Sequence, residues 1–294
     1  MMKEKYFYID PLCAQDLIRQ ANNLMWSKRG IDRHAYLFND YVVLSTNRLK
    51  LRNVTTRDDD LRYLDEIIET LSDLHQQGVA VVPILGYCYD PNTIDGTGFM
   101  IQKRAKGYEL FDDAAIAGFQ VWSQSQTEDL YLHGTMSKEE KKEYLLSRTQ
   151  MISRVPQRHY NKFVSDMICI LKHEILIDCF GKSNFFYDVD EGFQFIDLDA
   201  HNDYKYGITD QKPNIEAVVS FCGFVPCHYA SNTKLFSASA LDEHALLALT
   251  PSQQGKLAES NRAIFEKCIA ALRQNGVSES TLNNTLSKLK IYGV

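Results

Sequence analysis

The first third of the chain alternates strand-like and helix-like patterns, and their order limits the folds that it can adopt. Residues 34–38 and 41–46 are rich in β-branched and aromatic side chains and flank a polar two-residue turn, which predicts a β-hairpin. An apolar stripe at three- and four-residue spacing predicts a helix over 58–77. Strands are expected at 84–89 and 98–102. This order indicates a small antiparallel sheet with one main helix packed on it.

Helical patterns precede and follow this region. Residues 5–30 carry apolar side chains at helical spacing, and the helix is expected to end near Gly30. Beyond residue 110 a strand pair at 185–196 interrupts a series of predicted helices, which cover 157–173, 212–222, 239–249, 251–275 and 278–290. The patterns therefore predict an α+β chain with an N-terminal lobe over 1–105 and a larger, mostly helical lobe over 106–294.

Composition excludes several classes of protein. The net charge is −6 and no basic segment dominates, so nucleic acid is not expected as a partner. No run approaches the roughly 18 continuous apolar residues of a membrane span, and the first residues lack a signal-peptide pattern. The seven cysteines form no CxxC pair, which favours reduced thiols over zinc ligands or disulfides. We expect a cytoplasmic protein that does not enter the membrane.

Two oxygen-bearing side chains flank the strand pair at 185–196. Residues 188–192 predict a turn between two short apolar runs, so the segment is expected to form a β-hairpin. Asn184 precedes the first strand and Asp197 follows the second, and strand pairing brings such positions close together. Hard oxygen ligands suit Mg²⁺, which usually takes one or two carboxylates and shares its other positions with phosphates and water. A magnesium site is predicted here; an ordinary hairpin with polar ends is the alternative.

With its segments in this order, the chain resembles the protein-kinase-like superfamily, including the aminoglycoside-phosphotransferase and choline-kinase-like branches. Residues 82–89 look like the fourth strand of that family, and 99–111 are similar to its fifth strand and hinge. The resemblance covers residues 60–200 best. It implies a two-lobed kinase-like fold that binds ATP and Mg²⁺ and transfers the γ-phosphoryl group to a hydroxyl acceptor, either a protein or a small molecule.

The resemblance also implies roles for individual residues. The main helix would orient a phosphate-binding lysine through an acidic side chain, the hinge backbone would bind adenine, and the hairpin ends would hold the metal. A carboxylate would position the acceptor hydroxyl, with a lysine near the γ-phosphate. The implied nucleotide-binding residues are Lys50, Glu66, Glu69, Gln102, Lys103 and Ala105, the metal ligands are Asn184 and Asp197, and the catalytic residues are Asp178 and Lys182.

The chain also departs from the family pattern. Asp178 stands six residues before Asn184, where the family has five, and Ser45 stands where the third strand would carry its lysine. Lys50 and Arg48 are the nearest substitutes for that lysine. A full glycine-rich loop and an Ala-Pro-Glu segment are absent from the sequence. These departures point away from regulated eukaryotic protein kinases and toward small-molecule or atypical bacterial kinases.

Three alternatives stay open. A catalytically impaired pseudokinase would keep the fold and serve as a nucleotide-binding or protein-interaction module. Nucleotidyl transfer on the same scaffold would require the nucleotide to bind in a flipped orientation. An unrelated α+β protein would lack a single antiparallel sheet over 34–105 with the 58–77 helix packed on it. Whether the chain is an enzyme is therefore left undecided by its sequence.

Overall fold

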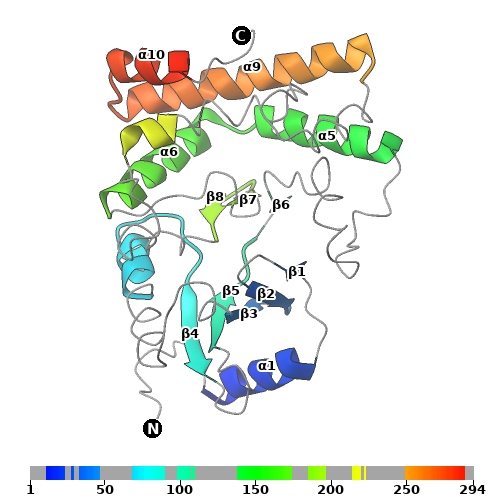
Figure 1. Ribbon diagram of the computed structural model, residues 1–294, viewed down its shortest axis with the longest axis vertical. Coiled ribbons are helices and arrows are strands. Elements are labelled where there is room, and N and C mark those ends of the chain that lie inside the picture. The colour runs from blue at the N-terminus through cyan, green and yellow to red at the C-terminus, as the bar shows by residue number, and fades with distance from the viewer. Residues whose placement is uncertain are drawn as a thin grey trace. The chain divides into compact units, whose positions relative to one another are not determined.

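The computed structural model describes residues 11–23, 28–29, 33–46, 68–89, 98–106, 108–109, 138–173, 185–196, 214–219, 222 and 249–288. The chain divides into two compact units, Met1–Lys106 and Gly107–Val294. The protein is of mixed α and β structure, and each unit contains an antiparallel sheet (Figure 1).

The first unit is built on a five-stranded antiparallel sheet with the order β1-β2-β3-β5-β4. The strands predicted at 34–46 and at 84–102 all belong to this one sheet, which the kinase-like interpretation of the sequence required. β5 lies between β3 and β4 and is therefore hydrogen-bonded along both edges. The strands are β1 (Lys28–Arg29), β2 (Arg33–Leu37), β3 (Tyr41–Thr46), β4 (Ile84–Tyr89) and β5 (Gly98–Lys103).

β2 and β3 form the predicted hairpin. Leu37 pairs with Val42, and the Phe38 N–H donates to the Tyr41 carbonyl oxygen at 2.9 Å, which closes the turn over residues 39–40. Side chains alternate between the two faces of a strand, so Val43 and its partner Ile101 on β5 project from the same face. Neither side chain is exposed to solvent.

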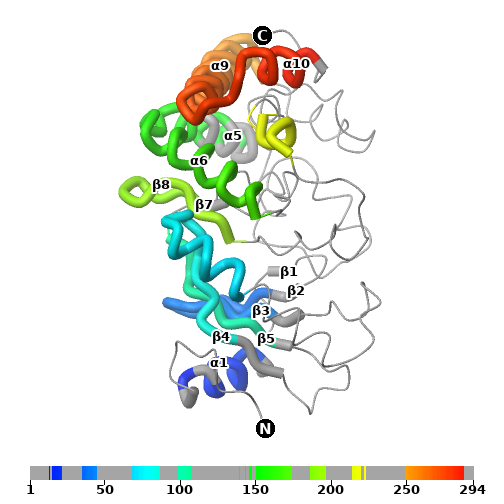
Figure 2. The backbone as a smooth tube through the Cα atoms, turned by 90° about the vertical axis from the view of Figure 1, so that its left-hand side faces the viewer, coloured from blue at the N-terminus to red at the C-terminus, as the bar shows by residue number. Residues whose placement is uncertain are grey.

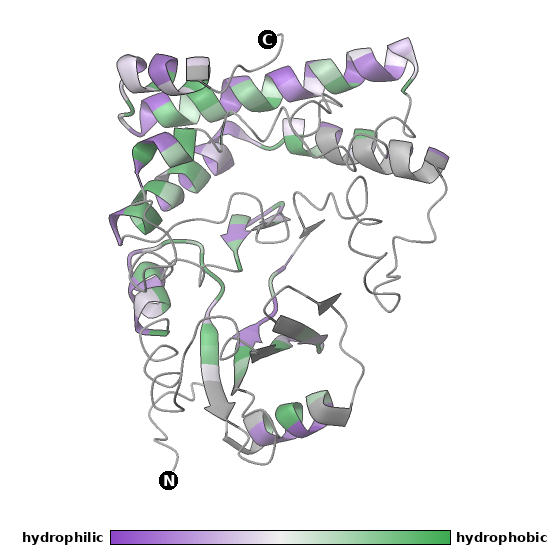
Figure 3. Ribbon diagram, in the orientation of Figure 1, coloured by the Kyte–Doolittle hydropathy of each residue, from purple (hydrophilic) through white to green (hydrophobic). Residues whose placement is uncertain are grey.

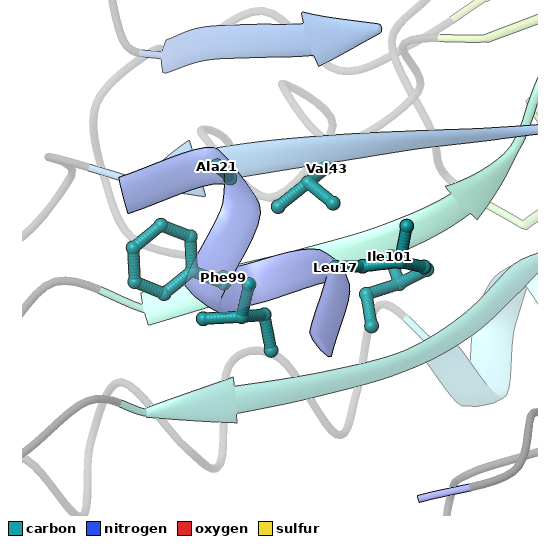
Figure 4. Packing of buried hydrophobic residues seen from close by; sticks show 6 residues of the cluster. Leu17, Ala21, Val43, Phe99 and Ile101 are labelled. Atoms are coloured by element: carbon teal, nitrogen blue, oxygen red, sulfur yellow. The ribbon is translucent and has the colours of Figure 1, made fainter. Parts of the chain in front are cut away.

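α1 (Pro11–Asn23) covers that face of the sheet. Leu17, Ile18 and Ala21 lie on one side of the helix and pack with Val43, Phe99 and Ile101 in one buried cluster (Figure 4). The prediction that this helix extends to Gly30 was wrong. Lys28 pairs with Ala35, and Arg29 with His34, so the chain has entered the sheet before Gly30. Strand pairing here outweighs the helical spacing of the preceding residues.

Residues 68–76 form the described part of the predicted main helix, and 58–67 lie outside the described residues. Ile68, Leu71 and Leu74 are buried, as the apolar stripe predicted. Gly78 follows the helix at φ +81°, a conformation that residues with a Cβ rarely adopt, which explains why the helix ends here. α1 and this helix lie on opposite sides of the sheet (Figure 2).

The second unit combines long helices with a small sheet, ordered β6-β7-β8. α9 packs against α5 and α6, and α6 packs against β8. α6 and α9 each carry both hydrophobic and hydrophilic residues (Figure 3). The predicted helices at 157–173, 251–275 and 278–290 are present, residues 215–219 are helical, and 239–248 lie outside the described residues. The elements are α5 (Lys138–Ser153), α6 (Gln157–Lys172), α9 (Pro251–Gln274), α10 (Glu279–Lys288), β6 (Tyr108–Glu109), β7 (Phe185–Asp188) and β8 (Gly192–Phe195).

Lys267 on α9 links the helices of the second unit by polar contacts. Its Nζ donates to the carbonyl oxygens of Ser153 at 2.6 Å and Val155 at 2.7 Å, where α5 ends. The Gln157 side chain at the start of α6 donates in turn to the Lys267 carbonyl oxygen at 2.9 Å. Burial lowers the pKa of Lys267. The last carbonyl groups of a helix lack partners within it and favour a nearby cation, and Lys267 supplies donors to the last carbonyl of α5 and to that of Val155 two residues beyond.

Within the described part of the chain, no helix combines the length and the apolar character needed to cross a bilayer. The four cysteines whose side chains are described, Cys13, Cys169, Cys222 and Cys268, are free thiols. These ranges also contain no group of three or more His, Cys, Asp or Glu side chains arranged to hold a metal ion.

Candidate functional site

The hairpin predicted to carry the metal ligands is present. β7 and β8 pair antiparallel, with Phe185 opposite Phe195 and Asp188 opposite Gly192. The Asp188 carboxylate accepts hydrogen bonds from the N–H groups of Asp190 and Glu191, each at 2.9 Å, and so orders the turn. Gly192 completes the turn at φ +89°. The local sequence thus fixes the register of the two strands.

Aromatic packing holds the hairpin on α6. The ring of Phe163 lies 4.5 Å from that of Phe193 and 5.3 Å from that of Phe195, with which it is stacked at an interplanar angle of 14°. The Tyr160 ring is 5.4 Å from Phe193. All four side chains are buried. Such contacts add to the apolar area that each ring removes from water, so this cluster makes a large contribution to the stability of the second unit.

A second contact fixes the turn end of the hairpin. His159 Nδ1 lies 3.0 Å from the Tyr187 hydroxyl in a buried hydrogen bond. A Cβ placed on Gly192 would lie 3.4 Å from the His159 ring, an ordinary van der Waals contact, so the positive φ of this residue is what favours glycine here. Burial lowers the pKa of His159, and the positive charge of Arg158 lowers it further, against an opposing effect from Asp188. Burial also raises the pKa of Tyr187, so both partners are neutral at neutral pH.

The strand β6 extends the hairpin into a three-stranded sheet, which the sequence analysis did not predict. Tyr108 pairs with Tyr187, and Glu109 pairs with Phe186. Its two residues are too few to produce a periodic signal, so only the pairing identifies the strand. β6 lies within the segment 99–111 that was likened to the fifth strand and hinge, and it is paired with the hairpin that the predicted metal ligands flank.

The predicted metal ligands themselves lie outside the described residues. Asn184 directly precedes Phe185, and Asp197 follows Phe195 by two positions, so the two residues flank the paired ends of β7 and β8. Their roles stay predictions. Four further predicted site residues also lie outside the described ranges: Lys50, Glu66, Asp178 and Lys182.

The predicted adenine-binding segment is described in full. Gln102 is buried on β5, and its Nε2 donates to the Val82 carbonyl oxygen at 3.2 Å. The Lys103 N–H donates to the Pro83 carbonyl oxygen at 3.1 Å, while the Lys103 side chain is exposed. Among the described residues, no hydrogen bond involves the N–H or C=O of Ala105. Ala105 therefore presents a backbone donor and acceptor two positions after Lys103, on a segment that these bonds hold in place.

Arg104 lies within the predicted adenine-binding segment of residues 102–105, but the sequence analysis predicted no role for its side chain. Its N–H donates to the Asp40 carbonyl oxygen at 2.9 Å, and its Nη1 donates to the Phe38 carbonyl oxygen at 3.1 Å. Both acceptors belong to the turn between β2 and β3. The contact joins residues 66 positions apart, so no local pattern could have revealed it.

Glu69 is the remaining predicted site residue that is described. It lies on the helix of residues 68–76 with an exposed side chain, and it forms no ion pair with any described residue. The structure therefore brings Gln102, Lys103 and Ala105 together on one segment and does not connect Glu69 to them by a hydrogen bond. The hinge and the hairpin belong to different units.

No protein-family model and no curated protein matches the sequence. Among solved structures, the co-crystal structure of WbdD with a kinase inhibitor aligns with 90% of this chain and 49% of its own, at a TM-score of 0.35 and 13% identity. A structure of the bifunctional kinase-methyltransferase WbdD covers 88% and 47%, at a TM-score of 0.33 and 13% identity. The chain spans about half the length of these WbdD chains.

A third solved structure, WaaP in complex with acyl carrier protein, aligns with 96% of this chain and 97% of its own. The TM-score is 0.33 and the identity is 14%. These similarities are too distant to assign the chain to a family. The function proposed next rests on the residues of the chain itself.

Proposed function

We propose that the chain binds a magnesium–ATP complex and transfers the γ-phosphoryl group to a hydroxyl acceptor. The hairpin of β7 and β8 carries this proposal, because Asn184 and Asp197 flank its paired ends. In this proposal the two side chains supply oxygen ligands to Mg²⁺, and the metal neutralises charge on the phosphates. Asp178 orients the acceptor hydroxyl, and Lys182 contacts the γ-phosphate.

The hinge supports the nucleotide half of the proposal. Ala105 has a backbone N–H and C=O that no described residue engages, and hydrogen bonds fix the three residues before it, Gln102, Lys103 and Arg104. Adenine has a donor and an acceptor on one edge, so such a segment suits it.

β3 and β5 are neighbours in the sheet, and the helix containing Glu69 lies between β3 and β4 in sequence. In kinases the phosphate-binding lysine lies on the third strand and pairs with a glutamate of the next helix.

Ser45 favours a second candidate function. It lies in β3 opposite Phe99, at the strand position where a phosphate-binding lysine is expected. A chain without that lysine would bind nucleotide yet transfer phosphate slowly or not at all. The second candidate is therefore a pseudokinase that serves as a nucleotide-binding or interaction module. Lys50, Arg48 and Glu66 are the residues on which the choice between the two depends.

A thermal-shift titration tests metal–nucleotide binding. Ligand at 100 times its Kd should stabilise the wild type by about 2.7 kcal/mol. We expect this gain with ATP to require Mg²⁺ and to disappear in Asp197→Ala. Asp190→Ala is the matched control, because Asp190 is an exposed acid at the turn end of the same hairpin. A Mg²⁺-dependent gain that persists in Asp197→Ala would contradict the metal assignment.

Product analysis separates the reactions once binding is established. ADP formed from ATP only when a candidate alcohol is added indicates phosphoryl transfer to that alcohol, whereas pyrophosphate indicates nucleotidyl transfer. We expect ADP, and we expect Asp178→Asn to abolish its formation without abolishing the thermal shift. A wild type that binds magnesium–ATP and forms neither product would support the pseudokinase.

A further inference from the structure

The turn between β2 and β3 is attached to the segment that follows β5 by two hydrogen bonds from one residue. The Arg104 N–H donates to the Asp40 carbonyl oxygen, and the Arg104 guanidinium donates to the Phe38 carbonyl oxygen. The first bond continues the ladder of β3 and β5 one position beyond the pair of Tyr41 and Lys103. The second bond is made by a side chain and depends on the identity of residue 104.

The acceptors of these bonds are well fixed. Phe38 donates its own N–H to the Tyr41 carbonyl oxygen at 2.9 Å, so the turn that carries both acceptors is closed. Val43, two positions after Tyr41, is fully buried in the cluster beneath α1. A guanidinium bound to such a carbonyl oxygen makes a charge-assisted hydrogen bond, which is stronger than one between neutral groups. The turn therefore supplies a rigid reference point for residue 104.

The opposite edge of the same segment is held independently. The Lys103 N–H donates to the Pro83 carbonyl oxygen, and the Gln102 side-chain amide donates to the Val82 carbonyl oxygen. Residues 102–104 are thus bound to the segment before β4 on one side and to the β2–β3 turn on the other. Ala105 is the first residue beyond these four bonds, and no described residue engages its backbone. Its orientation follows from how Arg104 is held.

We propose that Arg104 is a positioning residue, which uses the β2–β3 turn to orient the Ala105 backbone toward a purine base. This inference rests on the proposed nucleotide-binding function and extends it to a side chain and a turn that had no assigned role. Arg104 acts on recognition of the base and makes no contact with the phosphates. The β2–β3 turn thereby contributes to base recognition through Arg104, without contacting the base itself.

The alternative role for an arginine near a nucleotide is a direct phosphate contact, and two ligands separate the roles. ADP contains the base, whereas magnesium tripolyphosphate presents phosphates alone. We expect Arg104→Met, which keeps an unbranched apolar stem, to weaken ADP binding about tenfold, the equivalent of 1.4 kcal/mol. Binding of magnesium tripolyphosphate should not change. Calorimetric titration of the full chain measures both affinities.

Arg19→Met is the matched control, because Arg19 is an exposed arginine of α1 in the same unit and its loss makes the same change in charge. It should leave both affinities at the wild-type values. A second variant inserts two glycines between Asn39 and Asp40, which displaces the acceptors and leaves the hinge sequence intact. It should weaken ADP binding to a similar extent, and the combined variant should be no worse than either single change, because both break one link.

Unchanged ADP binding in Arg104→Met would overturn the positioning role. Equal weakening of ADP and tripolyphosphate would also overturn it, in favour of a phosphate contact or a general structural effect. Independent, additive effects of the substitution and the insertion would show that the turn does not act through Arg104. A wild type that binds neither ligand would reject the proposed function and this inference together. A wild type that binds ADP, with an Arg104→Met variant that binds it equally well, would reject this inference alone.

Discussion

The hinge and the hairpin are fixed by different kinds of interaction. Residues 102–104 are held by four hydrogen bonds to backbone carbonyl oxygens, and two of them come from side chains. The hairpin is held on α6 by stacked aromatic rings and one buried hydrogen bond. Hydrogen bonds are directional but contribute modestly to stability, whereas buried rings contribute strongly through the apolar area that they remove from water. The bonds at residues 102–104 thus mainly fix the orientation of the backbone, whereas the ring contacts of the hairpin mainly stabilise the second unit.

The largest expected effect is on the aromatic cluster of the second unit. Phe163→Ala should lower the free energy of unfolding by about 3–5 kcal/mol, because it leaves a cavity between α6 and the hairpin. Urea unfolding monitored by circular dichroism measures the change. Phe163→Leu is the matched control and should cost clearly less, since it fills much of the space. Equal losses in the two variants would show that the stacking with Phe195 matters more than the volume.

A smaller effect is expected at the hinge. Gln102→Leu keeps an apolar stem of similar size but leaves the Val82 carbonyl oxygen without its donor, at a cost of about 1–3 kcal/mol. Urea unfolding followed by a probe in the first unit measures it. Gln102→Glu serves as a comparison, because an ionised carboxylate cannot donate to that carbonyl. A Gln102→Leu chain as stable as the wild type would show that the hinge does not depend on this bond.

The smallest expected effect concerns His159 and acid. Burial lowers the pKa of His159, so the folded state takes up its proton at a lower pH than the unfolded state. Above the unfolded pKa, near 6.5, the histidine is neutral in both states and imposes no penalty. As the pH falls below that value, the unfolded chain gains a proton first, and stability is lost until the folded pKa is passed. Arg158 favours this loss, and Asp188 opposes it.

His159→Gln should reduce this acid-dependent loss, since glutamine can still bond to Tyr187 and does not titrate. Urea midpoints at about pH 7.5 and pH 5.5 for the two chains provide the comparison. His75→Gln is the control, because His75 is exposed on the helix of the first unit. An identical loss in the wild type and His159→Gln would show that other groups cause the acid sensitivity.

The sequence predicted the elements that periodic patterns encode. The β2–β3 hairpin, β4, β5 and the β7–β8 hairpin all follow from alternation and turn residues, and α6 and α9 follow from their apolar stripes. β1 and β6 were missed. Each has two residues, and a strand of two residues is defined by its partner and carries no period of its own.

The candidate site was predicted unevenly for the same reason. The hairpin that carries Asn184 and Asp197 is a local structure, so its turn and its apolar runs reveal it. The bond between His159 and Tyr187 joins residues 28 positions apart, and the bond between Arg104 and Phe38 joins residues 66 positions apart. Nothing in the neighbourhood of either residue signals its partner. Tertiary contacts of this kind require the fold before they can be identified.

The placement of β6 has a consequence for dividing the protein into fragments. β6 follows the end of the first unit after a single residue, Gly107, yet it forms an outer strand of the sheet in the second unit. A fragment of the second unit that began at residue 110 would lose this strand and leave β7 with an unpaired edge. Exposed edges recruit strands from other molecules. A fragment that keeps residues 107–109 retains β6, which pairs with that edge of β7. We expect this fragment to stay monomeric and the shorter one to self-associate.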